Sequence, residues 1–399
     1  MIFTTYWFLA FIGLALPLYW LVRRPGLRLA VLLVACTVFH ARFAGAAGML
    51  PILVLCATTY LAGLSRRRGV LLVGMALPIL ALVFYKYTSF LSQQVLAALN
   101  PAWGAALEQA LGSRLPDTPP LGVSFFVFEF VHYLYDVWHG HPSIRHPARF
   151  WAFTFFFPSL VAGPIKRYRD FLPALSAGLQ QVTLDDLKYG LWRIAQGYVK
   201  KVVLADNLTG AIDYWYPHFT ELTLPQRWLF LAALSFRILF DFSGYSDIAI
   251  GLARLMGIRL PENFRWPYLA RNLREFWQRW HISLSSWIRD YIYIPLGGSR
   301  HGVFRRSINV IIALALCGLW HGPAWNFVLW GVWHGVGLQV CTFYPTALGP
   351  VGGALQRGFA RLPILAWAVT FVFVALSRLI FFYPVPECFR LMRLLVVAQ

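Results

Sequence analysis

The stretch GAAGMLPILVLCATTYLAGL, residues 45–64, is 20 residues long and contains no charged side chain. About 20 apolar residues are what one α-helix needs to cross the hydrocarbon core of a bilayer. Over the whole chain of 399 residues, 59% of positions are apolar and only 13% are charged. A water-soluble globular protein does not have this composition. The sequence therefore predicts an all-α, polytopic bundle of transmembrane helices.

Further apolar stretches are candidates for spanning helices. The stretch Leu29–His40 is short, a length tolerated where protein rather than lipid surrounds the helix. No repeat, flexible linker or low-complexity tract interrupts the pattern, so we expect residues 1–399 to form a single membrane domain. The N-terminal stretch Ile2–Val22 has no basic residues before it, so it is expected to be a retained helix and not a cleaved signal peptide. The other clear stretches are Ile2–Val22, Gly69–Tyr85, Leu121–Val137, Leu229–Phe242, Ile308–Trp320, Ala324–Val340 and Leu362–Phe382.

The formal net charge of +19 does not point to nucleic acid. Basic residues cluster in short runs between apolar stretches, which is the pattern of the positive-inside rule. The runs around Arg24 and Arg67 should both be cytoplasmic, and two apolar stretches lie between them. This parity places the N-terminus outside.

Two segments do not fit a simple crossing. Phe150–Ile165 has basic residues on both sides and a central Pro158, which indicates a re-entrant segment. Residues 271–306 are rich in tryptophan and arginine, a mixture typical of short helices that lie along the inner interface.

The sharpest functional feature is CGLWHGPAWNF, residues 317–327, which places His321 and Asn326 in apolar sequence. A polar side chain at membrane depth is costly unless it has a partner or water, so it marks a candidate functional site. Gly322 and Pro323 should break the helix there. A neutral imidazole can take a proton from a hydroxyl that attacks a thioester. The alternative is a histidine that only hydrogen-bonds a neighbouring helix.

A second candidate, His281, lies within EFWQRWHISLSSWIRDYIYIPLGG, residues 275–298. By itself it is more typical of an interfacial anchor than of a catalytic group. Three arginines nearby could bind the phosphates of a donor such as coenzyme A, or equally the head groups of lipids. They are Arg274, Arg279 and Arg289.

Other polar side chains are better explained by structure. Glu129, His132 and Asp136 fall within roughly 60° on one helical face and are expected to form a polar network. Arg237 and Asp241 are spaced i, i+4, which predicts an intramembrane ion pair.

The five cysteines lie singly in apolar sequence, without the spacing of a disulfide framework or a metal site. We expect them to be buried, and no metal is predicted. Cys317 precedes His321 by one helical turn, so a covalent relay through its thiol stays an alternative. Motifs of nucleotide hydrolysis, serine hydrolases and zinc proteases do not occur in the sequence.

Six long motifs in order give the chain its resemblance to a known family. The chain resembles the membrane-bound O-acyltransferase family, and within it the bacterial branch typified by the membrane subunit of alginate O-acetylation. The motifs cover residues 121–140, 157–175, 200–208, 240–270, 275–298 and 317–335.

The resemblance implies helices around a central funnel, with the family's two histidines at His321 and His281. It implies a bacterial inner-membrane O-acetyltransferase that takes an acyl group from a cytoplasmic thioester, such as acetyl-CoA, without a permanently bound cofactor. The acceptor would be an extracytoplasmic polysaccharide, reached with an esterase-like partner protein. Trp320 and Asn326 would shape the pocket of His321.

Alternatives stay open at this point. D-alanyl transfer to teichoic-acid-type polymers uses the same chemistry, and a flippase or channel would need no bond chemistry. Relatives that act on alginate usually continue beyond the region matching Phe381–Met392, whereas this chain ends at Gln399. The sequence therefore leaves the identity of the polymer and of the partner protein open.

Overall fold

The computed structural model describes residues 2–116 and 118–397. Within these ranges every regular element is helical and no strand forms, which confirms the all-α expectation. Six helices are long and apolar enough to cross a membrane. They are Pro25–Gly45, Ala47–Ser65, Arg68–Leu99, Leu224–Leu255, Gly302–His321 and Pro363–Phe382.

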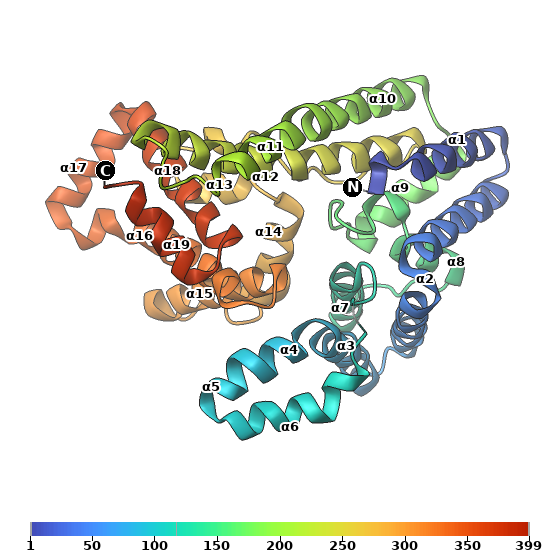
Figure 1. The fold of residues 1–399 in the computed structure, drawn as a ribbon. Helices are drawn as coiled ribbons and strands as arrows, with labels where there is room; N and C mark the ends of the chain where they lie inside the picture. The colour runs from blue at the N-terminus through green and yellow to red at the C-terminus, as the bar shows by residue number, and fades with distance from the viewer. Residues whose placement is uncertain (1, 117, 398–399) are drawn as a thin grey trace. The chain divides into compact units, whose positions relative to one another are not determined.

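The chain divides into two compact units, residues 1–198 with 245–261 and residues 199–244 with 262–399. Helix α12 (Leu224–Leu255) contributes to both units. The expectation of a single domain over residues 1–399 stays a prediction. The first unit contains α1 (Tyr6–Leu21), α2 (Pro25–Ser65), α3 (Arg68–Leu82), α4 (Thr88–Phe90), α5 (Ala97–Leu99), α6 (Pro101–Leu111), α7 (Val123–Trp138), α8 (Pro147–Thr154), α9 (Tyr168–Gln180) and α10 (Leu184–Tyr198) (Figure 1).

A kink divides α2 into two candidate spans. Gly45 adopts φ 66°, a left-handed conformation that favours glycine. The first half begins with Pro25 at its first turn, where proline is well tolerated. The sequence predicts a short helix over Leu29–His40. The observed helix is longer, because it extends from Pro25 to Gly45. Two spans thus separate the basic clusters around Arg24 and Arg67, as the parity argument requires.

Helix α7 carries the predicted polar network of the first unit and packs against α3. Glu129 forms a buried ion pair with Lys166, and Asp136 forms an ion pair with Arg169, with 3.2 Å between its Oδ2 atom and Nε. The Nδ1 atom of His132 lies 2.8 Å from the carbonyl oxygen of Phe128. The two ion pairs join α7 to the residues at the start of α9. The interpretation of these side chains as a structural polar network is confirmed.

The segment expected to be re-entrant contains no long helix. After α8 the chain forms a single 3-10 turn over Phe157–Ser159, which includes Pro158. Proline cannot donate a backbone hydrogen bond, and this explains why the helix does not continue. The side chains from Phe155 to Leu160 are buried, so protein surrounds this irregular backbone. Its path relative to a membrane stays a prediction.

The second unit holds the candidate site. Its tryptophan-rich stretch forms two seven-residue helices and a π-helical segment, short as expected. The rings of Trp277, Trp280 and Trp287 are buried, however, and do not lie at an outer surface. They pack the interior because helices from the rest of the unit cover them. The elements are α11 (Asp206–Trp215), α13 (Leu273–Arg279), α14 (Ile282–Ile288), η8 (Arg289–Tyr293), α15 (Gly302–His321), α16 (Trp325–Ala347), α17 (Gly349–Arg361), α18 (Pro363–Phe382) and α19 (Val385–Leu394) (Figure 1).

Helices α15 and α16 form a tightly packed antiparallel hairpin. A Cβ atom on Gly331 would lie 2.1 Å from the carbonyl oxygen of Leu314, so only glycine permits this approach. The hairpin turns at Gly322, which has an extended backbone, and α16 restarts at Trp325. The predicted helix break after His321 is confirmed.

The expected ion pair between Arg237 and Asp241 is wrong. Asp241 instead accepts from Lys201 at 2.6 Å, and the guanidinium of Arg237 lies 4.8 Å from the ring centre of Phe382. The i, i+4 spacing allowed the pair, but each side chain finds a partner from another segment of the second unit. Tertiary packing outweighs the small stabilisation of a pair within one helix.

Candidate functional site

His281 lies between α13 and α14, outside the six candidate spans. Its backbone adopts φ 44°, a conformation that is rare for a side chain with a Cβ atom and that often marks functional sites. The side chain is 2% exposed. Its Nδ1 atom lies 3.3 Å from the Oδ1 atom of Asn263, which also accepts from the hydroxyl of Ser283 at 2.6 Å.

This contact defines the tautomer of His281. Because the Asn263 oxygen is an acceptor, Nδ1 of His281 must carry the proton and donate it. The Nε2 atom then has a free lone pair. It is buried and has no hydrogen-bond partner in the described part of the chain. Burial, with a smaller contribution from nearby His321, holds the pKa of His281 well below its usual range. The ring is thus a neutral base with one nitrogen available.

His321 is the last residue of α15 and is half-buried within a group of aromatic rings. Its ring centre lies 4.9 Å from that of Trp320, 5.4 Å from Trp330 and 5.2 Å from Phe381. It is close enough to His281 to affect the charge of that ring. The structure therefore places the two sequence-predicted histidines within electrostatic range of each other, although 40 positions separate them in the chain.

Asn326 holds the group of rings in place. Its Nδ2 atom donates to the carbonyl oxygens of Ile380 at 3.2 Å and Phe381 at 3.1 Å. This bond ties the first turn of α16 to the end of α18 and keeps the Phe381 ring against His321. The amide thus helps to fix the Phe381 ring beside His321, and Trp320 contacts the same histidine ring. That these two residues shape a substrate pocket stays a prediction.

His334 is a third histidine that the sequence reasoning did not single out. It is fully buried, and its Nε2 atom lies 3.0 Å from the hydroxyl oxygen of Ser377. That hydroxyl donates to the carbonyl oxygen of Val374 at 2.6 Å, so His334 must donate through Nε2 and its Nδ1 atom keeps a lone pair. Its ring lies 4.9 Å from Trp330, the same ring that contacts His321. The tripeptide Trp-His-Gly occurs at both histidines, but it also occurs at the exposed His139, so this repeat by itself would not have identified His334.

Arg378 on α18 is the other residue that was missed. It is 1% exposed, and its guanidinium stacks on Trp280 at 4.4 Å from the ring centre. The signal was a single arginine within the apolar stretch Leu362–Phe382.

The three arginines predicted to bind a donor differ in their partners. Arg279 donates to Glu275 at 2.5 Å, and Arg289 donates to Asp290 at 2.6 Å. The side chain of Arg274 has no ion pair within the described residues and faces a cavity, so it is the one that is available to an anion.

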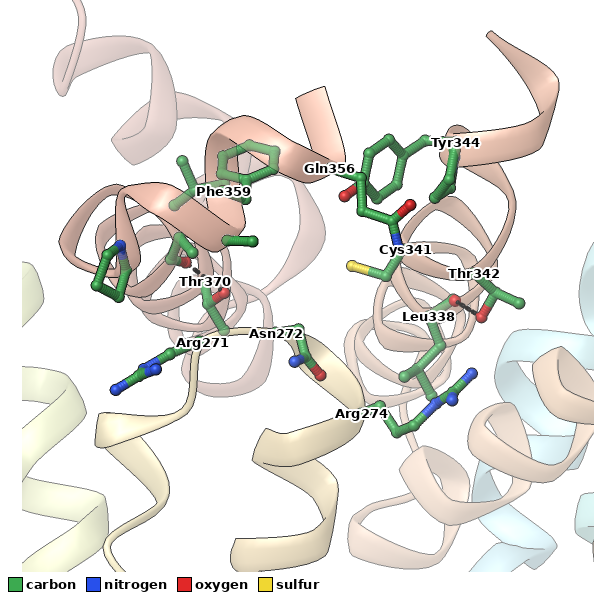
Figure 2. A pocket seen from close by; sticks show the side chains of 15 residues that line it. Arg271, Asn272, Arg274, Leu338, Cys341, Thr342, Tyr344, Gln356, Phe359 and Thr370 are labelled. Atoms are coloured by element: carbon green, nitrogen blue, oxygen red, sulfur yellow. Dashed lines mark hydrogen bonds between the residues drawn. The ribbon is translucent and has the colours of Figure 1, made fainter. Parts of the chain in front are cut away.

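This first cavity has a volume of about 560 Å³ and lies between α13, α16, α17 and α18. Figure 2 shows Arg271 and Arg274 on either side of Asn272, with Cys341 and Gln356 on the facing helices. The side chain of Arg271 likewise has no carboxylate partner among the described residues. Two positive charges therefore border a cavity whose walls are otherwise formed largely by apolar and uncharged polar groups.

A second, smaller cavity has a volume of about 150 Å³. It is lined by Trp277, Arg289 and Cys317, and Leu338 lines both cavities. The ring of Trp277 is 5.2 Å from His334. The two cavities thus share the side chain of Leu338, and the second borders Trp277, which contacts His334.

No group of three or more His, Cys, Asp or Glu side chains suited to a metal occurs in residues 2–116 and 118–397. His281, His321 and His334 contact aromatic rings, and His281 and His334 also contact an asparagine and a serine.

Comparisons with known proteins agree with this architecture. The profile described as the membrane-bound O-acyltransferase family matches residues 123–383. The chain is 38% identical over 312 residues to the probable alginate O-acetylase AlgI of Pseudomonas putida. The aligned region covers 78% of this chain and 61% of that protein. The chain is 34% identical to the peptidoglycan O-acetyltransferase of Helicobacter pylori, over 78% of this chain and 61% of that protein. It is 28% identical to the teichoic acid D-alanyltransferase of Bacillus subtilis, over 72% of this chain and 76% of that protein.

The aligned part of the chain spans between 48% and 61% of the length of the alginate O-acetylase relatives from two Pseudomonas species. The family match itself covers more than half of this chain and includes His281, His321 and His334. The chain belongs to the membrane-bound O-acyltransferase family.

Proposed function

We propose that this protein is a bacterial inner-membrane O-acyltransferase that moves an acetyl group from a cytoplasmic thioester to a hydroxyl of an extracytoplasmic polysaccharide. The observation that carries the proposal is the pair of neighbouring histidines, His281 and His321. One has a buried nitrogen with a free lone pair, and the other lies half-exposed at a helix break.

The chemistry requires a base where water is scarce. The acceptor hydroxyl oxygen attacks the carbonyl carbon of the thioester, and His321 takes the hydroxyl proton. The carbon–sulfur bond then breaks and the proton is returned to the sulfur, so that an ester and a free thiol leave. The free Nε2 atom of His281 is a second acceptor next to His321, nearer to the donor. A neutral ring at pH 7 is the form that can accept a proton.

The two cavities support a route for the donor. Arg271 and Arg274 border the first cavity, and phosphate groups bind well to arginines that lack a carboxylate partner. The start of α15 and the end of α16 lie at the same end of the hairpin. Arg300 precedes α15, and Arg357 and Arg361 follow α16. By the positive-inside rule this end is cytoplasmic. Leu338 also lines the second cavity, which borders Trp277, and the ring of Trp277 contacts His334.

The names of relatives support a glycan acceptor. Two of them are O-acetylating proteins of alginate and of peptidoglycan, both of which are carbohydrate polymers outside the cytoplasmic membrane. An esterase-like partner protein on the outer side would complete the transfer. The D-alanyltransferase relative supports the alternative donor, a D-alanyl thioester on a carrier protein.

The test uses the purified full chain in lipid nanodiscs with acetyl-CoA and an alginate or peptidoglycan oligosaccharide. Release of free coenzyme A and acetylation of the oligosaccharide are measured. We expect His321→Ala to abolish both, while His218→Ala, which removes an exposed histidine of the same unit, keeps them. Activity of His321→Ala at the wild-type level would remove the proposed role. Activity only with a D-alanyl carrier thioester would redirect the donor, and transport without acyl transfer would favour a flippase or channel.

A further inference from the structure

Arg378 is a buried cation that has no counter-ion in the described part of the chain. Its described contacts are the rings of Trp280 and Phe276 and the hydroxyl of Tyr268. No carboxylate among the described residues pairs with it. Its Nε and Nη2 atoms are buried and have no hydrogen-bond partner within residues 2–116 and 118–397. Such a guanidinium is strongly unfavourable unless an anion or another acceptor completes its hydrogen bonds.

Two indole groups have the same deficit, and they belong to the aromatic cluster that Arg378 contacts through Phe276. The Nε1 atoms of Trp277 and Trp330 are also buried without an acceptor in the described part of the chain. The two rings lie 5.9 Å apart, and each contacts the ring of His334. His334 in turn lies within electrostatic range of Arg378. Indole nitrogens only donate, so this cluster has more donors than acceptors and a net positive charge.

The cluster adjoins the proposed site. Trp280, on which Arg378 stacks, directly precedes His281 in the chain. One helical turn after Arg378, the ring of Phe381 lies 5.2 Å from His321. Trp330 contacts His321 and His334 at once. The unmatched donor of Trp330 therefore lies beside His321 and His334, and Arg378 stacks on the residue that precedes His281.

We propose that Arg378, assisted by the indole N–H groups of Trp277 and Trp330, binds the carbonyl oxygen of the acyl donor. When the hydroxyl oxygen bonds to the carbonyl carbon, the π electron pair of the C=O bond moves onto this oxygen. The oxyanion then lies against the guanidinium, and it reforms the C=O bond as the carbon–sulfur bond breaks. This inference rests on the proposed function and adds to it the group that stabilises the transition state. Donors placed in advance around a developing oxyanion act strongly where water is excluded.

The first experiment compares kinetic constants of variants in nanodiscs. Arg378→Met removes the charge but keeps much of the length, and we expect kcat to fall by about 100-fold or more while KM for acetyl-CoA stays within about threefold. Arg378→Lys keeps the charge without the planar fork and should lose less. The matched control is Arg237→Met, which removes another arginine stacked on an aromatic ring of this unit and should keep kcat within about threefold of wild type. A kcat of Arg378→Met within threefold of wild type overturns the inference.

A second readout does not depend on turnover. Acetyl-CoA with a ¹³C-labelled carbonyl is bound to His321→Ala protein, and the infrared carbonyl stretch is compared with that in the His321→Ala, Arg378→Met double variant. Hydrogen bonding to Arg378 should lower the frequency in the first protein only. Equal frequencies contradict the inference, because a merely structural arginine would not polarise the carbonyl group.

If Arg378→Met does not fold, Trp277→Phe and Trp330→Phe replace it, since each removes one N–H donor and keeps an aromatic ring. Each should lower kcat by roughly tenfold, and unchanged values would refute the inference. If the wild-type protein neither binds nor turns over acetyl-CoA, the proposed function fails and this inference with it. An active wild-type protein with an equally active Arg378→Met variant overturns the inference alone.

Discussion

The Nδ1 atom of His281 lies 3.3 Å from the Oδ1 atom of Asn263, and this contact decides which nitrogen of the histidine can act as a base. This amide oxygen carries no hydrogen and can only accept, and it also accepts from the hydroxyl of Ser283. His281 is therefore held with its Nε2 lone pair available. The relationship between these two residues leads to the first prediction.

Asn263→Ala should lower kcat for acyl transfer by about 10-fold to 100-fold, because the imidazole loses the acceptor that selects its tautomer. Asn263→Asp keeps an acceptor oxygen and should recover part of the activity. Ser283→Ala removes a different bond to the same oxygen and serves as the matched control, with a smaller effect. The rates are measured by coenzyme A release, and equal activity of all three variants would refute the assignment.

The burial of His281 also predicts a pH dependence of stability. A free histidine titrates near pH 6.5, whereas the pKa of His281 in the folded protein is well below this value. As the pH falls below about 6.5, the unfolded chain binds a proton that folded His281 does not bind. Its contribution to the free energy of unfolding is therefore complete above this pH and is lost below it, at up to about 1.4 kcal/mol per pH unit.

The measurement is thermal unfolding in detergent between roughly pH 8 and pH 5. His281→Gln should destabilise less on acidification than wild type, while His218→Gln, at an exposed position, should keep the wild-type slope. Parallel curves for wild type and His281→Gln would show that this ring titrates normally.

The basic border of the larger cavity predicts an effect on donor affinity. The double variant Arg271→Gln, Arg274→Gln should raise KM for acetyl-CoA by about tenfold, since each charge-assisted bond to a phosphate contributes on the order of 1 kcal/mol at an exposed position. The value of kcat should stay within about threefold, and added salt should reduce the difference. Arg390→Gln, which removes an arginine already paired with Glu387, is the control. A rise in KM equal to that of the control would exclude the cavity as the phosphate site.

The close contact between α15 and α16 predicts a stability effect without a change in chemistry. Gly331→Ala should lower the free energy of unfolding by about 1–3 kcal/mol, because the added methyl group would collide with the Leu314 carbonyl oxygen. Gly210→Ala is the matched control, since its Cβ atom would meet no atom within 4 Å. Alanine favours a helix interior over glycine, so this control should be neutral or slightly stabilising. Thermal unfolding in one detergent compares the two, and an unchanged midpoint for Gly331→Ala would contradict the packing argument.

Much of the architecture follows from local sequence. Backbone polar groups cannot stay unpaired in a bilayer, so a stretch of about 20 apolar residues has to become a helix wherever it folds. The break between Gly322 and Trp325 was likewise predictable, because proline and glycine act on their own backbone. The place of His321 at this break could therefore be inferred before any fold was known, and the family motifs identified His281 as its companion.

The partners of each side chain depend on tertiary structure. Asp241 binds Lys201, 40 positions away, although Arg237 lies one turn away on the same helix. Arg378 gains its importance from Trp280 and from donors that come from other helices, none of which is a neighbour in sequence. Helix formation is settled by short-range hydrogen bonds along one segment. The hydrogen bonds and charges of a buried site depend instead on which segments pack together, and only the folded chain brings those segments into contact.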